Sequence, residues 1–184
     1  AKPKRTILFI GFAGEEFGLL GAQAWVKAHK DKLPKIANLF NRDGGPEPPV
    51  GISVPQAMYD DFVKISEPIQ KIRPDYPFEV KVREPRKRPT RMGGTDASVF
   101  AIEGVPTLGF TTEDFKGYDF DYGEIWHTER DLYTKNIPEY QEHTATVTAI
   151  IALGVANLDK QLSREGLYTM LAGGMIGIVK DLSI

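Results

Sequence analysis

Residues 12–21, Phe12-Ala13-Gly14-Glu15-Glu16-Phe17-Gly18-Leu19-Leu20-Gly21, join an apolar segment to a helical pattern through two adjacent carboxylates. The segment before them, Thr6–Phe12, is almost continuously apolar and predicts a strand buried on both faces of a helix-covered sheet. From Glu15 to about Lys30 the apolar residues recur with helical spacing. This strand-turn-helix order predicts an α/β fold, in which functional side chains lie just beyond strand ends.

The adjacent acids Glu15 and Glu16 have two interpretations. At the start of a helix they project in different directions, so one could bind a metal while the other faces a water on that metal. We expect the helix dipole to stabilise both as anions. Acidic residues are also common in any first helical turn, and for the dipeptide alone this structural interpretation is favoured.

A second strand with an acid at its end is predicted at Lys35–Phe40, followed by Asn41-Arg42-Asp43-Gly44-Gly45. Asp43 is a candidate metal ligand, although Asp-Gly is also an ordinary turn signal. Further strands are predicted at 50–54, 78–82 and 105–111, and further helices at 55–72, 96–103, 137–158 and 162–171. The pattern predicts a three-layer αβα domain with a mixed, mostly parallel sheet, spanning 1–160, with a helix and tail at 161–184.

Composition restricts the chemistry. The 184 residues contain no cysteine and three histidines, so a metal would be held by Asp, Glu or His. A net charge of -2 argues against nucleic-acid binding, and no apolar run is long enough to cross a membrane. His127, in a loop beside Trp126, is the candidate ligand. His29 and His143 fall on helical patterns, and we expect them to be solvated.

The turn Gly93-Gly94-Thr95-Asp96 precedes a predicted helix. Thr95 or Asp96 could cap that helix, and a cap is compatible with a functional role. The loop 83–91 is basic and ends at Arg91, which could bind a substrate carboxylate, although a solvated loop is the favoured interpretation. The acidic stretch 113–124 could hold calcium, and again solvation is favoured. Strand-end acids, a loop histidine and this turn together suit zinc and hydrolysis.

These motifs resemble those of the co-catalytic zinc aminopeptidases and glutamate carboxypeptidases. The resemblance is carried by residues 12–21, by Asn41-Arg42-Asp43, by Gly94–Phe100 with Gly104-Val105-Pro106, and by Trp126-His127-Thr128 with Asp131. Their order and rough spacing agree from about Arg5 to Leu158. The Gly-Thr-Asp form is most similar to the plasma glutamate carboxypeptidase branch, so the resemblance implies the zinc exopeptidase fold.

The resemblance also implies residue roles. Glu15 would be the general base acting on a water that bridges two zinc ions. Glu16 and His127 would bind one zinc ion, and Asp43 would bind the other. Thr95, Asp96, Arg91 and Trp126 would support these ligands or contact the peptide substrate.

Two departures from the family accompany these roles. The family has a His-x-Asp-like pair upstream of its Glu-Glu segment, and only fourteen residues precede Glu15 here, so three of five ligands are present. Trp126 stands where several aminopeptidases have a tyrosine. We therefore expect the N-terminal part of the domain to lie upstream of Ala1, and the 184 residues alone to be inactive and to bind zinc weakly.

The predicted function is that of a zinc-dependent exopeptidase of aminopeptidase, dipeptidase or carboxypeptidase type. Its predicted partners are a peptide substrate and the missing part of its own domain, with homo-oligomers possible. The resemblance suggests a secreted or periplasmic location. A non-catalytic binding domain that keeps the fold is the alternative, and a single-zinc acyl transferase ranks last.

Overall fold

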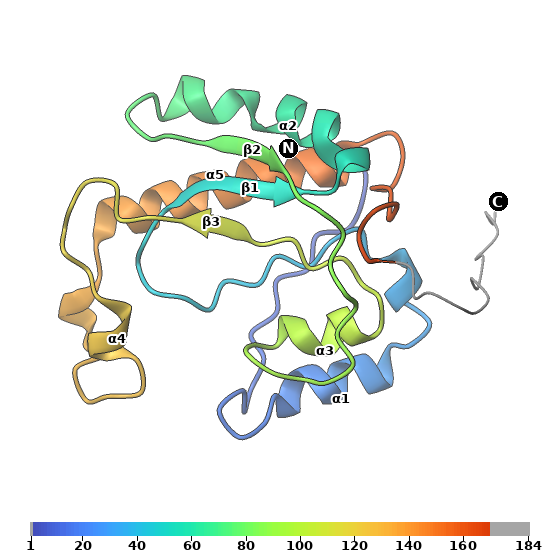
Figure 1. The fold of residues 1–184 in the computed structure, drawn as a ribbon, viewed down its shortest axis with the longest axis horizontal. Helices are drawn as coiled ribbons and strands as arrows, with labels where there is room; N and C mark the ends of the chain where they lie inside the picture. The colour runs from blue at the N-terminus through green and yellow to red at the C-terminus, as the bar shows by residue number, and fades with distance from the viewer. Residues whose placement is uncertain (1, 170–184) are drawn as a thin grey trace.

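The computed structural model describes residues 2–169 and shows a mixed α/β fold (Figure 1). A three-stranded sheet has the order β2-β1-β3, with β1 at Pro49–Val54, β2 at Glu79–Val82 and β3 at Phe110–Thr112. β1 pairs with β2 in parallel, Ile52 facing Val80, and with β3 antiparallel, Ile52 facing Phe110. The predicted α/β class and mixed sheet are confirmed, with one parallel and one antiparallel pair among the described strands.

Two long helices cover one side of this sheet. α2 (Tyr59–Ile72) and α5 (Pro138–Asn157) pack against each other, and they contact β2 and β1 respectively. Their apolar faces join the strands in one core, in which Ile52, Phe62 and Ile151 are almost fully buried. α5 begins at a proline, whose fixed φ suits the first helical turn, and its predicted bounds are confirmed to within one residue.

Two shorter helices, α1 (Leu20–Ala28) and α3 (Ala97–Ile102), form a second core with Leu33 and Val105. They lie together on the other side of the molecule from α2 (Figure 1). The remaining short elements are η1 (Leu33–Lys35), η2 (Gln56–Met58), α4 (Tyr122–Ile125) and η3 (Tyr133–Lys135). Within residues 2–169 no helix combines the length and hydrophobicity needed to cross a bilayer.

The segment 36–40 runs between the two cores without forming a strand. Ile36 and Leu39 pack on the α1/α3 core, whereas Ala37 and Phe40 pack on the core of the sheet. The side chain of Asn38 bonds both backbone groups of Leu108, at 2.9 and 3.2 Å. The strand predicted at Lys35–Phe40 is therefore wrong, because a side chain and one backbone bond, from Leu39 to Pro106, join the segment to its neighbour. Its residues 36–40 are partly buried and pack on both cores.

The strand predicted at Thr6–Phe12 is also wrong. No backbone ladder joins these residues to another strand within the described chain, and Phe9 is 93% exposed. A strand is stable only when a neighbour satisfies its backbone groups, and apolarity alone provides no such partner. Instead, Lys4 and Arg5 bind the end of α5, the backbone N–H of Lys4 donating to Asn157 at 3.0 Å.

Two other predicted elements differ from the structure. The strand predicted at 105–111 is confined to Phe110–Thr112, and the loop after it contains α4. The helix predicted at 162–171 does not form in its described part; Leu162 and Leu167 instead enter the sheet core. Arg164 donates to the carbonyls of residues 33, 34, 36 and 104, which ties this segment to the α1/α3 side. The tail 170–184 lies outside the described residues.

Candidate active site

The two adjacent glutamates lie on a tight turn, and α1 begins only at Leu20. The backbone N–H of Gly18 donates to the carbonyl of Glu15 at 2.9 Å. Gly14 and Gly18 have φ angles of 68° and 104°, which glycine adopts without steric cost. The prediction that Glu15 and Glu16 open the helix and are stabilised by its dipole is wrong, because the turn separates them from the first helical residue.

His127 lies at the same place, although it is far from Glu15 and Glu16 in the sequence. It follows α4 and has a φ of 56°, a left-handed conformation that is uncommon for residues other than glycine. Its Nε2 lies 3.1 Å from Oε2 of Glu16. The indole of Trp126 stacks on its imidazole with ring centroids 4.4 Å apart. A strained residue held in place in this way is a frequent feature of functional sites.

One cavity of about 690 Å³ brings the predicted residues together. Glu15, Glu16, Asp43 and His127 all line it, with Thr95 and Trp126. Other residues that were not predicted as site residues also line the cavity, among them Arg42, Tyr122, Tyr133, Lys135, Gln141 and Thr144. Arg42 adjoins Asp43, and Tyr133 follows the His127 motif. The position of these two residues close to predicted site residues in the sequence could have identified them.

The carboxyl groups at this cavity repel one another. Partial burial raises the pKa of Glu15 above its usual value, and the nearby carboxylates of Asp43, Glu16 and Asp96 raise it further, while His127 lowers it. A raised pKa makes a carboxylate a stronger base. The geometry therefore favours Glu15 as a group that can accept a proton.

Asp96 is not among the residues that line the cavity. Its side chain is buried, one oxygen has no hydrogen-bond partner, and burial together with Asp43 raises its pKa. It precedes α3 without capping it, because neither Asp96 nor Thr95 forms a side-chain bond to the first turn, so the predicted cap is wrong. Arg91 is exposed and is not among the residues that line the cavity.

The donor types fit a zinc ion, but the described residues do not complete a site. Glu16 and His127 are in contact, and a cation would relieve the repulsion that raises the pKa values of Glu15 and Asp96. Between residues 2 and 169, however, no three His, Asp or Glu side chains are grouped closely enough to hold a metal ion together.

Comparison with known proteins gives a consistent result. The model of the family described as Peptidase family M28 matches residues 1–151. Carboxypeptidase Q from Mus musculus is 24% identical over 169 residues, which are 89% of this chain and 32% of that protein. A probable zinc metalloprotease from Pyrenophora tritici-repentis is 50% identical over 42 residues, which are 23% of this chain and 10% of that protein.

A solved structure shares the fold. The crystal structure of a peptidase M28 precursor from Shewanella amazonensis SB2B has a TM-score of 0.66 and 26% identity, over 89% of this chain and 34% of that one. The matched region thus spans about a third of the length of carboxypeptidase Q and of this structure. The resemblance seen in the sequence motifs is confirmed at the level of the family.

Proposed function

The chain belongs to peptidase family M28, and from this premise we propose that it is part of a zinc-dependent exopeptidase that hydrolyses peptide bonds. The observation that carries the proposal is the contact between Glu16 and His127, 3.1 Å apart beside Glu15 in a cavity large enough for a peptide end. Carboxylate and imidazole are ligands that zinc prefers, and the unpaired neighbouring carboxylate is suited to proton transfer.

In this proposal each residue has its own role in hydrolysis. Glu16 and His127 would hold one zinc ion and Asp43 a second. Bound zinc would polarise the scissile carbonyl and make a water more acidic. Glu15 would accept a proton from the attacking water and pass it to the leaving amine, helped by the raised pKa of its carboxyl.

Other residues would act on the substrate or on its surroundings. Thr95 and Trp126 line the cavity, where they can contact the peptide, and Asp96 lies close enough to Asp43 for that carboxylate to raise the pKa of Asp96. Arg91 would bind the substrate carboxylate only if a longer substrate extends beyond the cavity. Secretion or a periplasmic location remains a prediction, as do homo-oligomers and the proposed domain boundary at residue 160.

The test is the substitution Glu15→Gln in the full-length protein. We expect hydrolysis of peptides to fall by about 10²–10⁴-fold, because a general base contributes that much. Zinc content, measured by mass spectrometry of metals, should stay as in the wild type, since Glu15 is not a proposed ligand. The matched change Glu16→Gln should lower both zinc content and turnover. Wild-type turnover in Glu15→Gln would reject the assignment.

A second candidate function has one observation in its favour. Since no three donors of the described part are grouped, the fold could serve as a non-catalytic binding domain. Zinc content of the full-length protein separates the two functions. Stoichiometric zinc supports the peptidase, whereas its absence from protein prepared with zinc present supports the binding domain.

A further inference from the structure

The loop that carries His127 is fastened to α5 close to both of its ends. The loop leaves β3 after Thr112 and meets α5 at Pro138. Near its start, Nζ of Lys116 donates to Oε2 of Glu139 at 2.6 Å, and the hydroxyl of Tyr118 also donates to that carboxylate. These bonds join the beginning of the loop to the helix on which the loop ends.

A second pair of side chains joins the same two places. The hydroxyl of Tyr140 donates to Oδ1 of Asp114 at 2.6 Å and accepts the backbone N–H of Lys116 at 3.0 Å. Asp114 also accepts the backbone N–H groups of Tyr118 and Phe120, at 3.1 and 3.4 Å. Tyr140 is fully buried and Asp114 is half-buried, so this pair is partly shielded from water. We call Asp114, Lys116, Tyr118, Glu139 and Tyr140 the base clamp.

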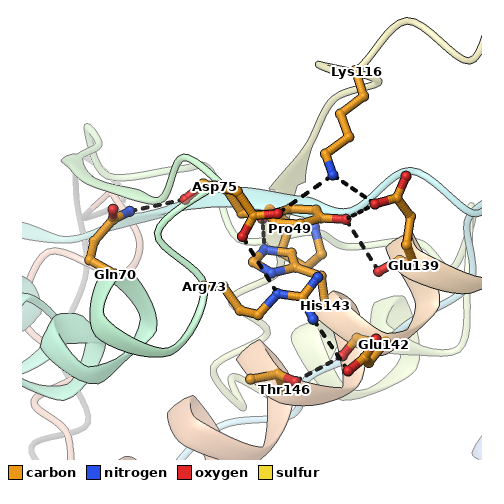
Figure 2. A network of polar contacts seen from close by, with 10 residues as sticks. Pro49, Gln70, Arg73, Asp75, Lys116, Glu139, Glu142, His143 and Thr146 are labelled. Carbon is orange, nitrogen blue, oxygen red and sulfur yellow. Dashed lines mark hydrogen bonds and ion pairs between the residues drawn. The ribbon is translucent and has the colours of Figure 1, made fainter.

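The turn after α2 supports the base clamp from a third direction. The hydroxyl of buried Tyr76 donates to Glu139 at 3.1 Å. Nζ of Lys116 lies 4.5 Å from the centre of the Tyr76 ring and 3.5 Å from Asp75. Figure 2 shows Lys116 directed toward both Asp75 and Glu139. The charged ammonium thus has partners on two elements, which fixes its position better than a single ion pair would.

Glu139 is the common acceptor of the base clamp. Lys116, Tyr118 and Tyr76 all donate to it, and these bonds lower the pKa of its carboxyl to about 2. The carboxylate is therefore charged throughout the neutral range, where charge-assisted bonds are stronger than those between neutral groups. The acidic stretch 113–124 could hold calcium or be solvated, and one of its residues, Asp114, is bonded within the base clamp.

The same helix also borders the active-site cavity. Gln141 and Thr144 line the cavity, whereas Glu139 and Tyr140 belong to the base clamp. Closing a flexible loop costs entropy, and a loop whose ends are held samples fewer arrangements. Fastening the ends near α5 therefore restricts where His127 can lie relative to the cavity wall.

We propose that Glu139 is a positioning residue, which keeps the base of the loop closed and so holds His127 against Glu16. The proposal rests on the proposed function for its effect on catalysis, but its structural part can be tested without catalysis. Small displacements of reacting groups reduce enzyme rates strongly, so a loosened loop should be detected in turnover.

The experiment compares Glu139→Gln with Glu142→Gln in the full-length protein. Both remove one negative charge from the first two turns of α5. Glu142 is 73% exposed and has a single ion-pair partner, Arg73 at 3.4 Å, so it is the matched control. Backbone hydrogen exchange of residues 119–136 measures the loop, exchange in α2 measures global stability, and kcat/KM for a peptide substrate measures positioning.

For Glu139→Gln we expect exchange in 119–136 to rise at least about tenfold, with α2 unchanged and kcat/KM lowered about 10- to 100-fold. The control should change none of these. Unaltered exchange in 119–136, or faster exchange with full kcat/KM, would overturn the proposal. An equal effect in the control would overturn it as well, because the loss would then follow from charge alone.

A milder variant covers the case in which Glu139→Gln destabilises the whole protein. Tyr118→Phe removes one hydroxyl donor from an exposed side chain. It should raise exchange in 119–136 and lower kcat/KM by a few-fold, and a wild-type result for both would contradict the proposal. If the wild-type protein hydrolyses no peptide, the exchange data still decide whether the base clamp holds the loop. In that case the proposed function is rejected, whereas the proposal about the base clamp is judged by the exchange data alone.

Discussion

The imidazole of His127 and the carboxylate of Glu16 meet at 3.1 Å although a turn and a long loop, far apart in the sequence, carry them. Both side chains are more than half exposed. An exposed pair of this kind contributes little to stability, at most about 1 kcal/mol. In the proposed function, its role is to bring two candidate zinc ligands to the cavity that contains Glu15.

The left-handed backbone of His127 gives the first prediction. Glycine adopts a φ of 56° without steric cost, whereas alanine does not. His127→Gly should therefore be more stable than His127→Ala by about 1 kcal/mol, measured by urea unfolding. Both variants should lose peptidase activity and bound zinc. Equal stability of the two would show that the strained conformation is not kept in solution.

The stacking of Trp126 on His127 leads to the second prediction. The rings lie 4.4 Å apart, and Trp126 lines the cavity while 55% exposed. Trp126→Phe keeps an aromatic face and should keep most of kcat/KM. Trp126→Ala removes the support and should lower kcat/KM by about tenfold. A larger loss in the phenylalanine variant than in the alanine variant would contradict a stacking role.

The third prediction concerns His143, which was expected to be solvated and is fully buried. Its Nε2 lies 3.0 Å from the carbonyl of Pro49, and its ring stacks on Tyr76 at 3.9 Å (Figure 2). A carbonyl only accepts, so Nε2 carries the proton, and Nδ1 has no partner. The earlier expectation is wrong because α5 turns this face toward the sheet core.

Burial lowers the pKa of His143 below 6.5, and the cations Arg73 and Lys116 lower it further. The hydrogen bond to the carbonyl of Pro49 and the charge of Asp75 raise this pKa, but by less. The unfolded chain then binds a proton that the native state does not. The contribution of neutral His143 to the free energy of unfolding is therefore complete above about pH 6.5. It is lost as the pH falls below this value, by at most about 1.4 kcal/mol per pH unit. The nearby carboxylate of Glu139, whose pKa is lowered to about 2 by the bonds from Lys116 and Tyr118, keeps its charge in this window.

The measurement is the free energy of unfolding in urea at pH 7.5 and pH 5.5. The wild type should be less stable at pH 5.5, and His143→Gln, which has no titrating group there, should lose less between the two pH values. The same pH dependence in both proteins would assign the effect to other groups.

The fourth prediction concerns Gly21, the last residue of the segment that suggested the fold. Its backbone N–H donates to the carbonyl of Ala13 at 2.8 Å, and a Cβ would lie 2.7 Å from both the nitrogen and the oxygen of Ala13. Gly21→Ala should therefore cost about 1–3 kcal/mol of stability and disturb the turn that holds Glu15. Gly93→Ala is the control, since nothing lies within 4 Å of its Cβ position. Equal thermal denaturation midpoints would contradict the close approach.

The grouping of the candidate site residues was predictable from the sequence. Glu15, Glu16, Asp43 and His127 stand in motifs whose order identifies the family, and all four line one cavity. Regular elements with their own local signals were predictable too, such as α5 with its initial proline, because helical bonds and capping lie within the segment itself.

The tertiary structure alone decided the properties that depend on distant groups. The apolar run Thr6–Phe12 forms no strand, since a strand needs a partner that its own residues cannot supply. The burial of His143 and the raised pKa of Glu15 depend on packing and on charges brought near by the fold. A sequence fixes which groups a chain carries, whereas distances and burial, which set their energies, exist only after folding.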